Sequence, residues 1–274
     1  MKMKSHPLWT CRRFTKVGDL EVPLNLPDDG DCIVRNLPLP GLLYWILKKP
    51  FRLRNRLLVD GYIERNIGKW INRYSRENDV ILDVGCGDMR LYKYVPRNRY
   101  YYALDISMNE LFLRGELSNK KTNLYFAFAS AIDIPLESDT VDVVTCIEVL
   151  EHIVGYMDAV REIWRVIKPN GLFLVSIPNN YGYKYTIKGQ HRDHHHAWSY
   201  EEFGNIMKSS NFDLVESFMI GRWLRLPLWL TKTSYQLPLR SKNEFYNSNF
   251  LYAFRARKDC TNDSGKSSGV TSTN

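Results

Sequence analysis

Short apolar runs alternate with polar segments through the middle of the chain. The first run, Val80 to Val84, is rich in β-branched residues and too short for a helix, as expected of a buried parallel strand. Four further runs repeat the pattern: Tyr100–Leu104, Phe126–Ala129, Val141–Ile147 and Leu172–Ile177. Strands that alternate with helices in this way predict an α/β fold built on a mostly parallel sheet.

The patterns on either side of this region extend the prediction. Residues 52–74 carry apolar side chains at helical intervals, which predicts a helix that covers the first strand. Residues 212–218 and 249–257 are predicted to be strands six and seven. Residues 221–248 form an insertion between them that is rich in aromatic side chains, and long insertions of this kind often act as lids or binding segments.

The predicted organisation has three parts. Residues 1–50 are punctuated by proline and are predicted to be an irregular N-terminal extension. Residues 51–257 are predicted to form the folded domain, since the chain has 274 residues and is 44% hydrophobic, enough for one sizeable core. Residues 258–274 are polar and rich in Ser, Thr, Asn and Gly, which predicts a disordered tail.

The first predicted strand ends in a turn suited to a nucleotide-type cofactor. Asp83 is followed by Gly85 and Gly87, which allow a tight turn with a bare backbone. A second acid, Asp105, closes the next strand, where a carboxylate is placed to accept both hydroxyls of a ribose. A dinucleotide-binding loop would carry a third glycine where this chain has Arg90. The pattern therefore indicates an adenosine-containing cofactor and argues against a dinucleotide-dependent oxidoreductase.

The ordered series of runs resembles the class I S-adenosylmethionine-dependent methyltransferases, and within them the small-molecule branch typified by the ubiquinone-pathway methyltransferases. The resemblance covers about residues 55–220. The segments that carry it are Val80–Asp88, Tyr100–Asp105, Phe126–Pro135, Val141–Ile153 and Ile167–Asn179. It implies a Rossmann-like seven-stranded sheet, mostly parallel with an antiparallel last strand and with helices on both faces, and it implies S-adenosyl-L-methionine as the cofactor.

The resemblance also implies a set of cofactor-binding residues. Gly85 and Gly87 would wrap the methionine end, Asp83 would orient its amino group, Asp105 would hold the ribose and Ile106 would flank the adenine. Ser130 stands where the family usually has an acid that contacts the adenine amine, so we expect weaker discrimination of the base. The full predicted set is Asp83, Gly85, Cys86, Gly87, Asp105, Ile106, Ser130 and Ala131.

Candidate catalytic residues follow the fourth predicted strand. Glu148, Glu151 and His152 would lie at the carboxyl edge of the sheet, where open α/β sheets bind ligands. Histidine is the side chain that most often accepts a proton in catalysis, so His152 is the first candidate base for a hydroxyl acceptor and Glu148 the second. In the resembling ubiquinone-pathway enzymes the matching acids and histidine are associated with magnesium. The same signature also occurs in relatives without a metal, so we expect no metal here.

A histidine-rich segment follows the fifth predicted strand. Residues 190–196 hold four of the six histidines. Three interpretations remain open: a zinc site, a solvated loop, and a substrate-binding loop. We favour substrate contact by His191, Arg192 and His194, because adjacent histidines rarely all bind one metal. Ser199–Glu202 has the form of a capping box that opens a helix.

Charge and cysteine content bear on partners and location. The net charge is +8, with basic residues gathered near 48–56 and 222–240 beside Trp and Leu, which suits an anionic membrane surface. No RNA-binding module is present, and we expect no nucleic-acid partner. Five cysteines without metal-type spacing indicate a reducing cytoplasm. The acceptor is therefore predicted to be a small or lipid-linked molecule, methylated at oxygen; the alternative function class is a catalytically silent binding module.

Overall fold

The computed structural model describes residues 13–17, 20–25, 33–35, 61–109, 123–182, 193–225, 234–240 and 244–258, together with positions 8, 10 and 242. The predicted tail is therefore outside the described residues except for Lys258. Three other predicted features also lie outside the described residues. They are the first part of the predicted helix at 52–60, the candidate substrate residues His191 and Arg192, and the basic cluster at 48–56.

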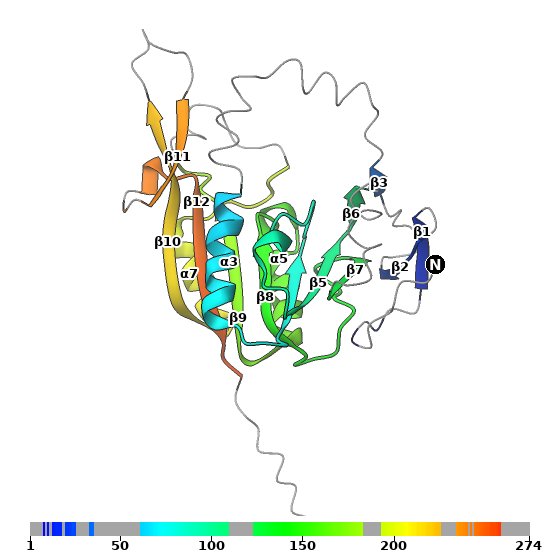
Figure 1. Cartoon of the computed structure of the whole chain (residues 1–274). Helices are drawn as coiled ribbons and strands as arrows, with labels where there is room; N and C mark the ends of the chain where they lie inside the picture. Colours follow the sequence, from blue (N-terminus) through cyan, green and yellow to red (C-terminus); the bar gives the residue numbers. More distant parts are fainter. Residues whose placement is uncertain are drawn as a thin grey trace, which may run out of the picture.

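The described residues form one ten-stranded sheet in the order β1-β2-β7-β5-β4-β8-β9-β12-β10-β11, and a separate pair β3-β6 (Figure 1). The strands are β1 (Arg13–Val17), β2 (Leu20–Asn25), β3 (Ile33–Arg35), β4 (Val80–Val84), β5 (Tyr100–Asp105), β6 (Ser107–Asn109), β7 (Leu124–Ala129), β8 (Val141–Ile147), β9 (Ile167–Pro178), β10 (Phe212–Arg225), β11 (Ser234–Arg240) and β12 (Asn249–Ala256). The central strands β7, β5, β4, β8 and β9 pair in parallel. β12 lies antiparallel between β9 and β10, which confirms the predicted antiparallel last strand.

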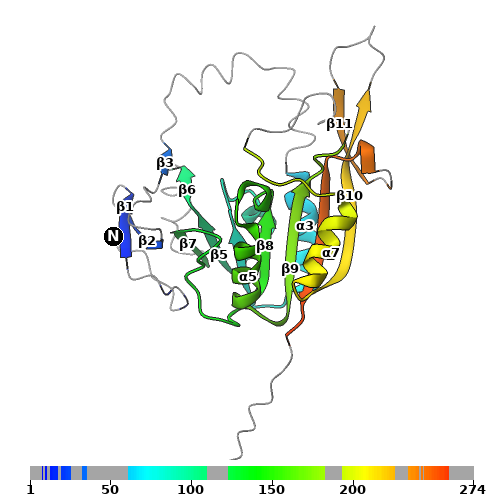
Figure 2. The same cartoon turned by 180° about the vertical axis from the view of Figure 1, so that it is seen from behind.

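Helices cover both faces of this sheet, as predicted. α3 (Tyr62–Tyr74) lies on one face, whereas α5 (Tyr156–Val166) and α7 (Tyr200–Ser209) lie on the other (Figures 1 and 2). Three short 3-10 turns complete the described helical elements: η1 (Tyr92–Tyr94), η2 (Leu150–His152) and η3 (Glu244–Tyr246). α7 begins at the predicted capping box, in which the Ser199 side chain accepts from the Glu202 amide at 3.2 Å.

The side chains of β4 show how one strand serves two cores. Leu82 and Val84 point into the core under α5 and α7, and Ile81 points into the core under α3. All three are fully buried, because successive strand residues face opposite sides of a sheet that is covered twice. This explains why the strand is an unbroken apolar run.

The sheet is wider than predicted. Seven strands correspond to the predicted ones, and three more flank them among the described residues. Residues 1–50 were predicted to be irregular, but β1 and β2 pair there as an antiparallel hairpin. Pro23 lacks an amide donor, and β2 pairs with β7 only after it, at Leu24 and Asn25. Proline content thus concealed a short strand.

The predicted insertion at 221–248 is also partly regular. β10 continues past the predicted strand end at Phe218 to Arg225, and β11 pairs with it in antiparallel fashion. Residues 226–233 lie outside the described part of the chain. The sequence pattern predicts an insertion here, whereas the described parts of this segment in β10 and β11 extend the sheet edge.

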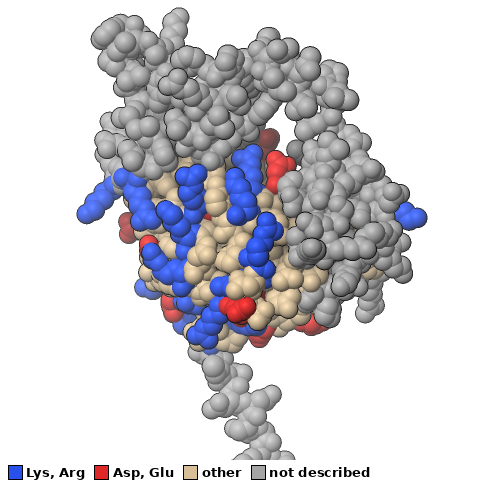
Figure 3. Space-filling view, in the orientation of Figure 1, with Lys and Arg blue, Asp and Glu red and all other residues tan. Residues whose placement is uncertain are grey.

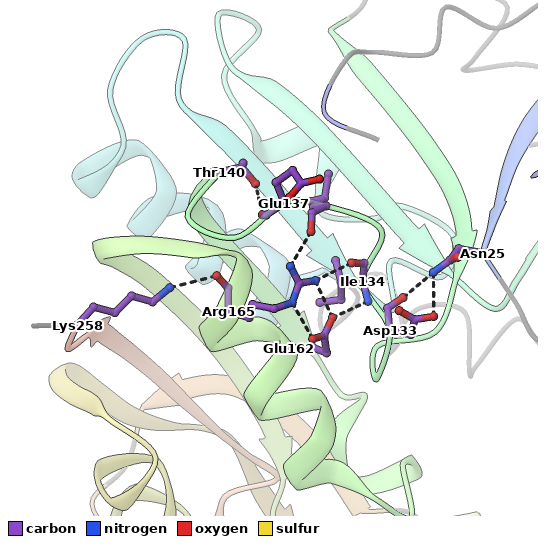
Figure 4. A network of polar contacts seen from close by, with 9 residues as sticks. Asn25, Asp133, Ile134, Glu137, Thr140, Glu162, Arg165 and Lys258 are labelled. Carbon is purple, nitrogen blue, oxygen red and sulfur yellow. Dashed lines mark hydrogen bonds and ion pairs between the residues drawn. The ribbon is translucent and has the colours of Figure 1, made fainter. Parts of the chain in front are cut away.

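A polar network fixes the loop that follows β7 (Figure 4). The Arg165 guanidinium on α5 donates to the backbone oxygens of Ile134 at 2.8 Å and Leu136 at 2.7 Å, and also to Glu162. The Glu162 carboxylate in turn accepts from the Ile134 amide at 2.9 Å. Asn25 on β2 donates to Asp133. The loop is therefore held from two sides, and with it the carboxyl end of β7.

Candidate active site

The loop after β4 contains two glycines with different surroundings. Both are left-handed, Gly85 with φ +69° and Gly87 with φ +50°. A Cβ on Gly85 would lie 2.9 Å from Cγ1 of Val149 and closer still to Cγ2, whereas a Cβ on Gly87 would meet nothing within 4 Å. Gly85 is therefore required by packing against the turn after β8. Gly87 borders open space, as a cofactor-binding backbone must.

Asp105 anchors this loop. Its Oδ2 accepts from the Gly87 amide at 2.8 Å and its Oδ1 accepts from the Ser107 amide at 2.9 Å. A carboxylate has about four acceptor positions, and the contact of Asp105 with ribose hydroxyls stays a prediction. The adjacent Ile106 side chain is 56% exposed, unusual for an isoleucine at a strand end and suited to cover an adenine ring.

Asp83 lies beneath the loop rather than on its surface. It is 3% exposed, and its carboxylate accepts hydrogen bonds from the Tyr101 hydroxyl and, at 2.7 Å, from Thr145 Oγ1. Burial raises the pKa of this carboxyl to about 6, although the two hydrogen bonds oppose the shift. Its contact with the cofactor amino group stays a prediction. The neighbouring Cys86 is also buried, and burial raises the pKa of its thiol.

The predicted adenine-side residues lie beside Asp105. β7 pairs with β5 in register Asp105 to Phe128, so Ser130 and Ala131 follow at the neighbouring strand end. Ser130 is half-buried and Ala131 is buried. The structure thus brings together Gly87, Asp105 and Ser130 from three adjacent strands at the carboxyl edge.

Glu148 is held firmly at the end of β8. Its Oε1 accepts from Ser176 Oγ and its Oε2 from Asn249 Nδ2, both at 2.8 Å. Its φ of +56° is rare for a residue other than glycine, and such backbone is found where surrounding contacts over-determine it. These two hydrogen bonds fix the Glu148 carboxylate at the end of β8, and its role as a second candidate base stays a prediction.

Sequence reasoning missed the residues that hold Glu148. Ser176 lies on β9 and Asn249 on β12, and Asn249 also accepts from the Tyr62 hydroxyl at 2.7 Å. Burial raises the pKa of Tyr62, so it stays a neutral donor. The available signal was polar residues inside otherwise apolar strand patterns, since buried polar groups need partners.

Glu151, His152 and His194 meet beside the turn at Val149. Glu151 and His152 belong to η2, and His194 comes from the segment after β9. His152 Nε2 lies 3.8 Å from Glu151 Oε1, and the His152 and His194 rings meet edge to face with centroids 4.8 Å apart. Burial, and then the charge of Glu148, raise the pKa of Glu151 well above its usual range. Of the three residues predicted to contact substrate, only His194 is described.

Comparison with known proteins places this site in a family. Residues 82–175 match the family model described as a methyltransferase domain. An uncharacterized protein of Methanocaldococcus jannaschii is 34% identical over 122 residues, 44% of this chain and 51% of the relative. The ubiquinone biosynthesis O-methyltransferase of Rickettsia akari is 28% identical over 148 residues, 54% of this chain and 55% of the relative. The chain thus spans about half the length of these curated relatives.

A solved structure shares the fold. A chain in the complex between the Haloferax volcanii Trm112 methyltransferase activator and a methyltransferase superposes with a TM-score of 0.57 at 18% identity, covering 75% of this chain and 94% of that one. The residues present also fit S-adenosylmethionine, because Gly87 borders open space and Asp105 stands at the next strand end. The matched methyltransferase domain and the shared fold together support a class I S-adenosylmethionine-dependent methyltransferase.

Proposed function

We propose that this protein transfers a methyl group from S-adenosylmethionine to an oxygen atom of a small or lipid-linked acceptor. The observation that carries the proposal is the close packing of the two site halves, in which Gly85 of the cofactor loop abuts Val149, directly before η2 and His152. Similarity to the ubiquinone biosynthesis O-methyltransferase of Rickettsia akari supports oxygen as the acceptor atom.

The cofactor supplies an electrophilic methyl group on a sulfonium ion, and the chain's residues bind and orient the reactants. Gly87 and Asp105 would hold the adenosine and methionine parts, with Ile106 and Ser130 around the base. Alignment of donor and acceptor is the main source of rate in such a displacement. A hydroxyl acceptor also has a proton to lose.

His152 is the group placed to take that proton. Its Nδ1 lies 2.9 Å from the backbone oxygen of Asp193, which only accepts hydrogen bonds. Nδ1 therefore carries the hydrogen and Nε2 the lone pair in the neutral ring. Nε2 lies 3.8 Å from Glu151 Oε1, in the turn after β8, and we propose that the acceptor oxygen approaches it there.

The test is identification of the acceptor. The purified chain is incubated with S-adenosylmethionine labelled in the methyl group and with separate metabolite and lipid extracts of a host cell, and the labelled product is located by mass spectrometry. We expect label on an oxygen atom of one compound class. Label on nitrogen or carbon would overturn the O-methylation, and binding of S-adenosylhomocysteine without any turnover would favour the silent binding module.

Contact with an anionic membrane surface and a cytoplasmic location belong to the same proposal. Figure 3 shows Lys and Arg gathered on the face that α3 covers, where Arg65, Lys69 and Arg73 are exposed. Cys86 and Cys146 are free thiols, which fits a reducing compartment. None of the described helices is long and apolar enough to cross a bilayer. Co-sedimentation with phosphatidylglycerol vesicles, but not with phosphatidylcholine vesicles, is the expected result.

A further inference from the structure

Three metal-ligating side chains converge at the end of β8. Glu151, His152 and His194 each offer a ligand atom, and these atoms lie within 4.8 Å of one another. The first two residues are on η2, whereas His194 belongs to a different segment that follows β9. The backbone oxygen of Glu151 accepts from the His195 amide at 2.8 Å, which fixes the two segments together. The cluster is therefore set by the fold.

The buried carboxyl group of Glu151 lacks a hydrogen-bond partner among the described residues. The residue is 1% exposed, and neither Oε1 nor Oε2 accepts a hydrogen bond from any described residue. Burial of a carboxylate without hydrogen bonds or a counter-charge costs several kcal/mol, and buried charges in proteins are accordingly paired or coordinate metals. A cation between Glu151 and the two imidazoles would supply the missing partner.

Hydrogen bonds set both histidines in the tautomer that coordinates through Nε2. The Nδ1 of His152 donates to the backbone oxygen of Asp193, as described above. The Nδ1 of His194 lies 3.3 Å from Asn180 Oδ1, and the Asn180 amide nitrogen donates to the His196 backbone oxygen at 3.1 Å. That second bond orients the Asn180 side chain so that its oxygen faces His194. Metal-binding histidines commonly donate their other ring nitrogen to a carbonyl in this manner.

We propose that Glu151, His152 and His194 bind a divalent transition-metal ion of the zinc class. Two imidazoles and one carboxylate are a donor set that zinc takes with a fourth position open, whereas magnesium prefers oxygen ligands and waters. Glu148 is not among the ligand atoms that converge here, and Ser176 and Asn249 hold its two oxygens. The proposed site therefore differs from the set matching Glu148, Glu151 and His152 that is associated with magnesium in the resembling enzymes, and it departs from the expectation of no metal.

The metal site does not depend on the identity of the acceptor. The lone pair of His152 Nε2 serves either the cation or the acceptor proton, so the loaded protein uses His152 as a ligand and the metal-free protein uses it as a base. Binding is therefore measured without cofactor or acceptor. If no metal binds, the proposed methyl transfer is unaffected. If no methyl transfer is found, the proposed metal binding is likewise unaffected.

The experiment uses the untagged full chain after removal of metals with a chelator. Zn²⁺ is titrated by calorimetry, and Co²⁺ by its visible absorption, with His194→Ala, Glu151→Gln and the control His195→Ala measured beside the wild type. His195 is the adjacent histidine, exposed and outside the cluster. We expect one ion per chain in wild type and His195→Ala. The affinity should fall at least ~10-fold in the other two variants, since even changes behind a ligand cost about 10–100-fold.

Two results would overturn the proposal. One is the absence of stoichiometric Zn²⁺ and Co²⁺ binding to the wild type. The other is an equal loss of affinity in His194→Ala and His195→Ala, which would mean that the exposed histidines bind metal without a built site. Competition by Mg²⁺ at equal concentration would contradict the zinc-class assignment. Circular dichroism of Glu151→Gln, which keeps the size of the side chain, separates loss of a ligand from loss of the fold.

Discussion

The cofactor half and the acceptor half of the site are built in opposite ways. In the cofactor half, the Gly87 amide and the Asp83 carboxylate both have partners on the adjoining strand β5, at Asp105 and Tyr101. In the acceptor half, Glu151 is buried with no hydrogen-bond partner among the described residues, and Glu148 has a left-handed backbone. The polar groups of the first half are paired within adjoining strands, whereas in the second half Glu148 depends on Ser176 and Asn249 and Glu151 accepts no hydrogen bond from the described residues.

The largest effect is expected in the acceptor half. His152→Ala should lower turnover of the metal-free protein by about 10²–10⁴-fold, because loss of a general base costs on that scale. Its affinity for S-adenosylhomocysteine should stay within about two-fold, since that ligand lies in the other half. Turnover is measured on the acceptor found by labelling, in the presence of a chelator. Unchanged turnover would return His152 to a structural or metal-binding role.

The next effect falls in the cofactor half. Asp105→Ala should weaken S-adenosylhomocysteine binding by about ten-fold or more, since a hydrogen bond to a charged group contributes roughly 1.5–3 kcal/mol. Asp88→Ala is the matched control, because Asp88 is an exposed acid in the same loop, 4.0 Å from Arg90. Calorimetry measures both. Equal affinities for the two variants would place the ribose elsewhere.

The two glycines of the loop separate stability from binding. Alanine at a left-handed position costs roughly 1–2 kcal/mol, so Gly87→Ala should unfold slightly earlier and bind S-adenosylhomocysteine more weakly. Gly85→Ala should lose more stability than this, because its methyl group would meet Val149. Urea unfolding compares the variants. Adding Val149→Ala should recover part of the Gly85→Ala loss, and strict additivity of the two changes would refute the contact.

The smallest effect is a pH dependence of stability from Asp83. Burial raises the pKa of Asp83 in the folded state to about 6 from an ordinary value of 3.8, so the folded state holds the proton more tightly. This contribution is fully present below the lower value and is lost as pH rises through about 6. Asp83→Asn removes it. Its free energy of unfolding relative to wild type should therefore rise on the order of 1 kcal/mol between pH 4 and pH 7, and a constant difference would show that Asp83 titrates normally.

The sequence predicts strands β4 and β5, whose ends carry the predicted cofactor residues, for a local reason. β4 and β5 are continuous apolar runs, and each closes on residues, Gly85 and Asp105, that mark the end of a strand in the sequence itself. The acceptor half depends on contacts between residues far apart. Nothing in the spacing links Glu151 to His194, or Glu148 to Asn249, because these pairs form only when several strands have assembled.

The sequence does not predict the outer strands of the sheet, because the pattern it relies on is burial on both faces. Central strands have that pattern, but β1 and β11 lie at the two edges of the sheet. Edge strands are partly exposed and need not be continuous apolar runs, so their sequences carry only a weak hydrophobic pattern. The sequence therefore predicted the centre of the sheet and not its width.

The hydrogen bond between Asn249 and Glu148 joins residues that are 101 positions apart, and β12 enters the sheet between two strands that precede it in the chain. Translation at about 5–20 residues per second would separate these two residues by roughly 5–20 s. During that interval β9 has an open edge and Glu148 lacks one of its donors. A ribosome-bound chain can therefore form the loop after β4 early, but the carboxyl end of β8 gains its full set of hydrogen bonds only once β12 has been synthesised.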